Sequence, residues 1–427
     1  MRVLAKEILK AAKDGVKEAR VAGWVHRIRD MGGVSFVVLR DRSGMAQLVM
    51  DTKPDFTLES VISAVGEPAL NDRAQGGAEL RVKSLEVLSR AATDMPFQVN
   101  GDVGRMGLEA ILDNRGLSLR NPKIRAIFKV QSTIIAAFAD HLRSEDFTEI
   151  KTSKLVGGGT EGGTELFEVD YFDRKVWLAQ SPQAYKETMV GSGLERVFEI
   201  APAYRAEKHD TPRHLNEYVS LDVEMGFIDS EKDLIELEKR VLARVFAEVA
   251  AKNGEELALW NAAVPAPETV AASPVISYEE ATKIATAEAR VKIYDINPEA
   301  ERLLCEWSLR ERGSDLVFVN EFPRRHRPFY TYPLDNARTM SFDALFRGLE
   351  ITTGGRRHHD YQTLYDTLPR FGLKPENMEA YLAMLKYGCP PHGGFAIGCE
   401  RLTQKILGLG NVKEASLFPR DRKRVSP

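Results

Sequence analysis

Residues 198–207, FEIAPAYRAE, and residues 213–227, RHLNEYVSLDVEMGF, form the stretch of sequence that decides the fold. Apolar and aromatic residues predict a strand in each run, and the polar residues 208–214 predict a loop between them. Arg205 would stand at the end of the first strand. A guanidinium there suits a phosphate, because it offers two parallel donors and never loses its charge. An ordinary hairpin with surface ion pairs fits the same local pattern.

Further strands and helices flank this stretch. Residues 341–354, SFDALFRGLEITTG, and residues 393–398, GGFAIG, read as strands, whereas residues 233–252 and 399–408 read as helices. Several strands follow one another without the crossover helices that a parallel sheet needs. The pattern therefore predicts an α+β domain built on a largely antiparallel sheet flanked by helices.

A long helix is predicted ahead of these strands. Asn121 can cap it, Pro122 suits its first turn, and apolar residues recur at helical spacing from Ile124 to Leu142. This apolar face predicts either a core contact or a subunit interface.

The N-terminal part reads as a small all-β barrel. Four runs rich in strand formers are separated by turns, and they cover residues 16–29, 34–41, 45–51 and 79–89. Short strands at this spacing favour a barrel of the oligonucleotide-binding (OB-fold) type. Glycines and a proline without a sustained period then predict a hinge. We expect a barrel over 1–95, a hinge over 96–120 and a catalytic domain over 121–427.

Composition narrows the class of protein. The chain has 427 residues, of which 43% are hydrophobic and 28% charged, as expected for a globular multidomain protein. Its three cysteines show no CxxC spacing, which argues against a disulfide framework or a cysteine zinc site. The N-terminus lacks the apolar run of a signal peptide or membrane span, so a cytoplasmic protein without membrane contact is expected. A net charge of −3 leaves any RNA contact to local basic patches.

The sequence contains neither GxxxxGK[ST] nor GxGxxG after a strand, so a bound nucleotide must be held by arginines and a metal ion. Asp343 and Glu350 could hold Mg²⁺, which prefers hard oxygen ligands, or could simply be satisfied by Arg347 and its neighbours. Arg401 opens a predicted helix, where a ligand anion would offset its unfavourable position on the helix dipole. Pairing of Arg401 with Glu400 or another acid is the alternative.

The motifs, taken in order, resemble those of class II aminoacyl-tRNA synthetases. The helix 123–147 with residues 148–150 resembles the first motif, the opening stretch the second, and GGFAIGCERL (393–402) the third. Within that class, further segments resemble the aspartyl-tRNA synthetases of the archaeal type: TEGGTELF (160–167), LAQSPQAYK (178–186), LEITTGGRR (349–357), PPHGGF (390–395) and LFPRDRKR (417–424). The resemblance spans nearly the whole chain and implies a homodimer that uses ATP and Mg²⁺ to activate L-aspartate and load it onto tRNA.

The resemblance also implies roles for individual residues. The catalytic arginines would be Arg205 and Arg401, and the ATP site would comprise Arg205, Glu207, Arg213, His214, Glu350 and Arg401, with Mg²⁺ on Asp343 and Glu350. The aspartate site would comprise Lys186 and Arg357 on the side-chain carboxylate, with Glu161, Gln183 and Asp222 around the ammonium group. Asparagine would be rejected because its neutral amide leaves the two cations uncompensated.

In the barrel, the resemblance implies that Phe36 stacks on an anticodon base while Arg29 and Gln47 read base edges. Core packing is the alternative for Phe36, which shares a strand face with Val34 and Val38. His26 and Gln75 occupy the two positions linked to the choice between tRNA(Asp) and tRNA(Asn). A histidine rather than a larger ring at position 26 favours charging of both tRNAs, and implies a downstream amidotransferase. The alternative for His26 is a solvated strand residue.

Several alternatives stay open. A strictly discriminating aspartyl enzyme and an asparaginyl enzyme share the fold and motifs, although Arg357 and the DRKR ending argue against the latter. An asparagine synthetase derived from the catalytic domain would lack the barrel, and a non-enzymatic regulator would be expected to have lost Arg205 or Arg401. The chain departs from the family at Ser153, where proline is usual at the dimer interface, and at Arg356, where glutamine is usual.

Overall fold

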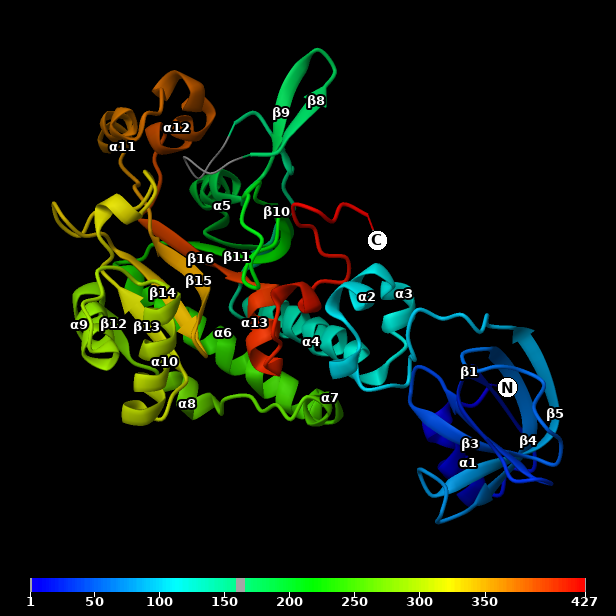
Figure 1. Ribbon diagram of the computed structural model, residues 1–427. Coiled ribbons are helices and arrows are strands. Elements are labelled where there is room, and N and C mark those ends of the chain that lie inside the picture. Colours follow the sequence, from blue (N-terminus) through cyan, green and yellow to red (C-terminus); the bar gives the residue numbers. More distant parts are fainter. Residues whose placement is uncertain (1, 159–165, 427) are drawn as a thin grey trace. The chain divides into compact units, whose positions relative to one another are not determined.

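The computed structural model describes residues 2–158 and 166–426 (Figure 1). The chain divides into two compact units, Met1–Asn121 and Pro122–Pro427. The predicted hinge region contains short helices, with a 3-10 turn η2 at Val103–Arg105, then α2 (Leu108–Asp113) and α3 (Arg115–Ser118). The division at residues 95 and 120 stays a prediction.

The first unit contains a closed five-stranded barrel in the order β1-β2-β3-β5-β4, as expected for an OB-fold. Its elements are η1 (Ala5–Glu7), α1 (Ile8–Lys13), β1 (Ala19–Asp30), β2 (Ser35–Arg40), β3 (Met45–Met50), β4 (Val61–Leu70) and β5 (Ala78–Ser89). The predicted turn after β2 forms because the Asp41 carboxylate accepts a hydrogen bond from the Ser43 amide at 2.7 Å. Alternating residues such as Val37 and Leu39 are buried in the barrel core.

Strand β4 was not among the predicted strands. Gly66 and Pro68 interrupt its pattern, since both residues are rare in strand interiors. The structure explains the glycine: β4 bulges against β5 between Val65 and Gly66. A Cβ atom at Gly66 would lie 2.0 Å from the Arg81 carbonyl oxygen.

The second unit is built on an eight-stranded sheet in the order β12-β13-β14-β15-β16-β11-β10-β6. Only the pairs β10–β6 and β12–β13 are parallel, so the predicted antiparallel α+β architecture is confirmed. The strands are β6 (Thr148–Glu149), β10 (Arg196–Tyr204), β11 (Glu217–Gly226), β12 (Val275–Ser277), β13 (Leu316–Asn320), β14 (Ser341–Phe346), β15 (Leu349–Arg356) and β16 (His392–Gly398). A separate three-stranded sheet contains β7 (Leu155–Val156), β8 (Glu168–Tyr171) and β9 (Arg174–Leu178).

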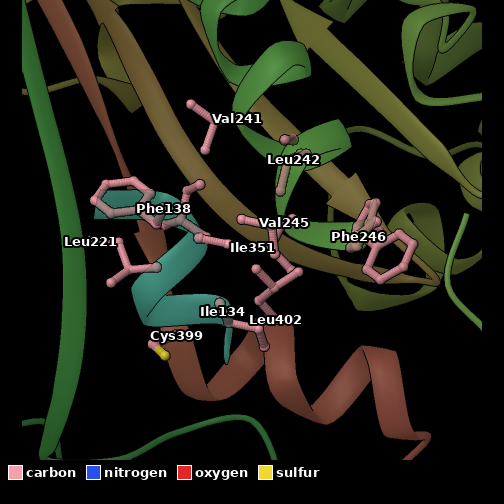
Figure 2. Packing of buried hydrophobic residues seen from close by; sticks show 14 of the residues in the cluster. Ile134, Phe138, Leu221, Val241, Leu242, Val245, Phe246, Ile351, Cys399 and Leu402 are labelled. Carbon is pink, nitrogen blue, oxygen red and sulfur yellow. The ribbon is translucent and has the colours of Figure 1, made fainter. Parts of the chain in front are cut away.

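Three helices form the main core with this sheet: α4 (Pro122–Ser144), α6 (Glu231–Lys252) and α13 (Cys399–Leu407). Figure 2 shows Phe138 of α4, Val245 of α6 and Leu402 of α13 packed together. The apolar face predicted for α4 is therefore core in this chain. The other helices are α5 (Gln183–Met189), α7 (Gly254–Leu259), α8 (Pro267–Ala271), α9 (Tyr278–Ala289), α10 (Pro298–Arg312), α11 (Tyr361–Thr367) and α12 (Glu379–Lys386).

Strand β11 separates this core from the polar side of the sheet. Leu221 and Val223 pack into the core, whereas Ser220, Asp222 and Glu224 alternate onto the opposite face. Short helical turns connect other elements: η3 (Val190–Leu194), η4 (Arg324–His326), η5 (Leu368–Phe371), η6 (Pro375–Met378) and η7 (Val412–Ala415). Among the residues that the structure describes, no helix combines the length and apolar character needed to cross a membrane.

Candidate active site

The polar side of the sheet holds a cavity of about 270 Å³. It lies among β11, β15, β16, the start of α13 and the loop after β10. All the residues predicted to bind ATP line it: Arg205, Glu207, Arg213, His214, Glu350 and Arg401. These residues come from positions nearly 200 apart in the sequence, so the fold alone brings them together.

Arg205 and Arg401 reach this cavity from different elements. Arg205 directly follows β10, its guanidinium carbon lies 5.7 Å from the centre of the Tyr218 ring, and 42% of its side chain is exposed. Arg401 lies in the first turn of α13, where its Nη1 donates to the Glu350 carbonyl oxygen at 2.9 Å. The acidic partner of Arg401 is Glu350, at 3.4 Å. Glu400 instead accepts from the Val219 amide, at 3.0 and 3.1 Å.

The loop between β10 and β11 carries Arg213 and His214. Arg213 forms an ion pair with Glu301 of α10. The Nδ1 atom of His214 lies 2.6 Å from the Thr211 hydroxyl. Burial and the charge of Arg401 lower the pKa of His214, so its ring is neutral at neutral pH and can donate one hydrogen bond.

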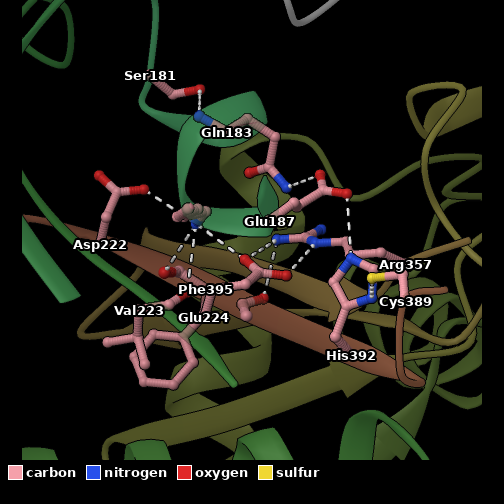
Figure 3. Close-up of polar contacts among 12 residues, drawn as sticks. Ser181, Gln183, Glu187, Asp222, Val223, Glu224, Arg357, Cys389, His392 and Phe395 are labelled. Carbon is pink, nitrogen blue, oxygen red and sulfur yellow. Dashed lines mark hydrogen bonds and ion pairs between the residues drawn. The ribbon is translucent and has the colours of Figure 1, made fainter. Parts of the chain in front are cut away.

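The residues predicted to bind aspartate form a buried cluster (Figure 3). Lys186 of α5 places its Nζ 3.0 Å from Asp222 and 3.4 Å from Glu224. Arg357 donates from Nε to Glu224 at 3.1 Å. The Ser220 hydroxyl, which lines the cavity, donates to Asp222 at 2.5 Å and so joins the cluster to the cavity.

Glu224 is a residue of this cluster that the sequence analysis missed. It is fully buried and lies between the two cations. The only signal in the sequence was its spacing of two residues from Asp222 on one strand, which places both carboxylates on the same face. The expectation that Lys186 and Arg357 lack compensation without a ligand carboxylate is therefore wrong, because Asp222 and Glu224 already balance them.

Gln183 and Glu161 were also predicted to belong to the aspartate site. Gln183 is the first residue of α5, and its side-chain amide donates to Glu187 at 2.6 Å. Glu161 lies outside the described residues.

The predicted metal ligands lie on neighbouring strands. Asp343 of β14 pairs with Arg327 at 2.8 Å, and burial raises the pKa of Asp343 to about 7. Glu350 of β15 accepts from the Thr353 hydroxyl at 3.3 Å. Arg347 pairs with Asp315 instead of either carboxylate, so the part of the alternative that names Arg347 is wrong. The two carboxylates pair instead with Arg327 and Arg401. Within residues 2–158 and 166–426, no group of three or more His, Cys, Asp or Glu side chains is arranged to hold a metal ion.

Three of the predicted anticodon residues share the outer surface of the barrel. Arg29 of β1 pairs directly with Phe36 of β2, and Gln47 of β3 pairs with Val38. Cross-strand partners point to the same side of a sheet, as do residues two apart. Phe36 is half-buried on this outer surface while its neighbour Val37 lies in the core, so the core-packing alternative is wrong.

His26 lies at an irregularity of β1, between Val25 and Arg27. It is 9% exposed, and its Nδ1 lies 2.9 Å from Nη1 of Arg40, which is itself paired with Glu59. Burial and the charge of Arg40 lower the pKa of His26. The solvated alternative is therefore wrong, and a neutral His26 that accepts from Arg40 carries its proton on Nε2. Gln75 is exposed in the turn before β5.

Comparisons with known proteins give matches for both parts of the chain. Residues 107–422 match the family of class II tRNA synthetases (D, K and N), and residues 19–88 match the OB-fold nucleic acid binding domain. The chain is 47% identical to an aspartate–tRNA(Asp/Asn) ligase of Thermus thermophilus, over 100% of both chains. It is 40% identical to an aspartate–tRNA(Asp) ligase of Pyrococcus horikoshii, over 96% of both.

A solved structure is also similar over the full length. It is the asparaginyl-tRNA synthetase of Pyrococcus horikoshii complexed with asparaginyl-adenylate. The TM-score is 0.92 at 30% sequence identity, and 100% of each chain is covered.

Proposed function

This chain belongs to the class II tRNA synthetases (D, K and N), and from that premise we propose that it activates L-aspartate with ATP and transfers it to both tRNA(Asp) and tRNA(Asn). One observation carries the choice of aspartate. Arg357 keeps N–H groups that Glu224 and the Gly394 carbonyl do not use, and it shares Glu224 with the buried Lys186. Full-length relatives that bear the name aspartate–tRNA(Asp/Asn) ligase support the choice of tRNAs.

In the activation step, the α-carboxylate of aspartate attacks the α-phosphorus of ATP, a phosphorus–oxygen bond forms and pyrophosphate leaves. Arg205 and Arg401 approach the cavity from β10 and α13 and would stabilise the negative charge that develops on the α-phosphate. Arg213 and His214 would contact the outer phosphates, and Glu207 the adenine side. Because His214 is neutral, it would contribute a hydrogen bond and Arg213 the charge.

Mg²⁺ fits the carboxylates of Asp343 and Glu350. Glu350 of β15 lines the cavity, and Asp343 lies on the neighbouring strand β14. Magnesium is commonly held by one or two carboxylates together with substrate phosphates. Bound there, it would neutralise charge on the phosphates. Asp343 would have to exchange its Arg327 partner for the ion.

Aspartate would bind with its ammonium group near Asp222 and its side-chain carboxylate near Lys186 and Arg357. Arg357 uses Nε and Nη2 on Glu224 and on the Gly394 carbonyl, which leaves donors for a ligand because a guanidinium has five N–H groups. Asparagine would present an amide NH₂ to these cations, and two donors facing each other without an acceptor are unfavourable.

Reading of both tRNAs would depend on the barrel. His26 is held by Arg40, and its small ring would leave room for either pyrimidine at the third anticodon position. If tRNA(Asn) receives aspartate, a tRNA-dependent amidotransferase must convert the product to asparaginyl-tRNA(Asn). We also propose a homodimer that works in the cytoplasm.

Aminoacylation with purified components tests this proposal. Transcripts of tRNA(Asp) and tRNA(Asn) are each offered with aspartate or with asparagine. We expect aspartate to be attached to both transcripts with kcat/KM values within about tenfold, and asparagine to neither. An efficiency for tRNA(Asn) lower by roughly a thousandfold, about 4 kcal/mol of discrimination, would contradict dual reading. Charging with asparagine would favour the asparaginyl alternative.

A further inference from the structure

Glu187 is a buried carboxylate with no role in the site as described so far. It follows Lys186 on α5 and is fully buried. It accepts hydrogen bonds from the side-chain amide of Gln183 and the hydroxyl of Tyr381, both at 2.6 Å. Its Oε2 also lies 3.2 Å from Nε2 of His392 (Figure 3).

The contacts of His392 define its protonation. Its Nδ1 lies 2.9 Å from the Pro390 carbonyl oxygen, which can only accept, so Nδ1 carries a proton. Bonds from Gln183 and Tyr381 favour the ionised form of Glu187, and a carboxylate can only accept, so Nε2 of His392 carries a proton as well. His392 and Glu187 therefore form an ion pair, and both side chains are fully buried.

Each member of this pair holds a residue of the amino-acid site. A carboxylate accepts only, so Glu187 fixes the Gln183 amide with its NH₂ toward Glu187 and leaves its carbonyl oxygen for another partner. The carbonyl oxygen of His392 accepts from the Arg357 backbone amide at 2.8 Å. A ligand ammonium needs an acceptor and a ligand carboxylate needs the Arg357 guanidinium, so the two residues that contact this pair are ones that the two ends of the ligand would use.

We propose that the Glu187–His392 ion pair positions Gln183 and Arg357 for amino-acid binding, and that Tyr381 links it to the helical segment between β15 and β16. This inference rests on the proposed function. Glu187 and His392 do not reach the ligand themselves, so they are positioning residues. The pair orients the side-chain amide of Gln183 and the backbone at Arg357. It does not alter the cavity that Arg205 and Arg401 line.

The test is the variant Glu187→Gln, assayed by aspartate-dependent exchange of pyrophosphate into ATP. The new amide no longer forces one orientation on Gln183 and leaves the charge of His392 unpaired. We expect KM for aspartate to rise roughly tenfold, the size of one misplaced hydrogen bond, with KM for ATP and kcat within about twofold. An unchanged KM for aspartate, or a parallel rise in KM for ATP, would overturn the proposal.

Glu231→Gln is the matched control. Glu231 is also buried and accepts from an amide, Nδ2 of Asn320 at 2.8 Å, but it lies on α6, and neither residue lines the cavity. It should leave both KM values unchanged. The double variant Glu187→Gln/His392→Gln removes both charges and should be no worse than Glu187→Gln alone, because the pair acts as a unit. Fully additive losses would contradict that.

A measurement on the wild-type protein does not depend on how any variant folds. Nitrogen-15 NMR should show one histidine ring protonated on both nitrogens at pH 8, and this signal should vanish in His392→Gln. A neutral His392 ring at pH 8 overturns the ion pair. Absence of wild-type exchange with aspartate would instead overturn the proposed function, so the two failures are distinguishable.

Discussion

At the scale of single residues, the two arginines of the cavity should matter most for the rate. Arg401→Ala removes a guanidinium that lines the cavity, while its helix keeps its buried apolar face. We expect kcat for pyrophosphate exchange to fall by roughly 100- to 1000-fold, the usual cost of one donor to developing charge. Arg310→Ala, at an exposed arginine paired with Glu288, is the control. A loss of less than about fivefold in folded Arg401→Ala would refute the role of Arg401.

Glu238 predicts a pH dependence of stability. It is fully buried on α6, and desolvation raises its pKa to about 8 from the ordinary 4.5. The folded protein therefore binds this proton more tightly than the unfolded chain does. The free energy of unfolding should decrease as pH rises from about 4.5 towards 8, and then level off with respect to this group.

Glu238→Gln should remove that dependence, because an amide does not titrate. The unfolding free energy of the variant minus that of wild type should increase by a few kcal/mol when the pH is raised from 5 to 8.5, since one pKa unit corresponds to about 1.4 kcal/mol. Urea denaturation at both pH values measures it. Equal pH slopes in the two proteins would show that Glu238 titrates normally.

At the scale of elements, the C-terminal segment holds the loop that carries Arg213 and His214. The Val412 amide donates to the Pro212 carbonyl, and the Asn216 amide donates to the Arg420 carbonyl, both at 2.9 Å. Lys413 lies between Asp210 of the loop, at 2.7 Å, and Asp421 of the segment, at 2.6 Å. This loop lines the cavity, and residues that follow α13 therefore hold it in place by hydrogen bonds and ion pairs.

Lys413→Met should loosen this loop and raise KM for ATP about fivefold, with a smaller effect on KM for aspartate. The reason is that truncating one member of a buried charge network leaves the carboxylates Asp210 and Asp421 without their shared partner. Lys423→Met is the matched control, because Lys423 lies 3.8 Å from the same Asp210 but is 84% exposed. Equal effects of the two substitutions on KM for ATP would argue against this role of Lys413.

At the scale of the whole molecule, the two units have separate cores. The barrel core contains residues between Ala5 and Leu80, whereas the core around α4, α6 and α13 begins at Ile127. Among the described residues, those that line the cavity and those that form the cluster around Lys186 and Arg357 all belong to the second unit. Amino-acid activation should therefore persist when the barrel that is proposed to read the anticodon is removed.

A fragment of residues 122–427 should retain pyrophosphate exchange within about tenfold of the full chain. Its kcat/KM for tRNA charging should fall roughly 100-fold or more, because stacking on a base is worth about 1–3 kcal/mol and several barrel contacts are lost together. Circular dichroism checks that the fragment is folded. Charging by the folded fragment at the full-length rate would mean that the barrel does not contribute to tRNA recognition.

Local sequence patterns were enough to predict many of the helices, strands and turns of this protein. The helix 122–144 and the strands β10 and β11 follow from periodicity and strand-forming residues, and Arg205 and Arg401 follow from their places beside predicted strands. The turn at Asp41 follows from turn chemistry. Strand β4 did not follow, because its glycine is required by a bulge against β5, which is a contact between separate segments.

By itself, the sequence determined the fold class and predicted residues that line the cavity, because the order of motifs and local periodicity can be recognised without knowledge of contacts. Only the tertiary structure decided how charges are balanced. Glu224 meets Arg357 across 133 residues of sequence, and Glu187 meets His392 across 205. The sequence alone does not distinguish a solvated carboxylate from one that is buried against a cation. Its role depends on desolvation and on the partner's position, and both arise only when distant strands come together.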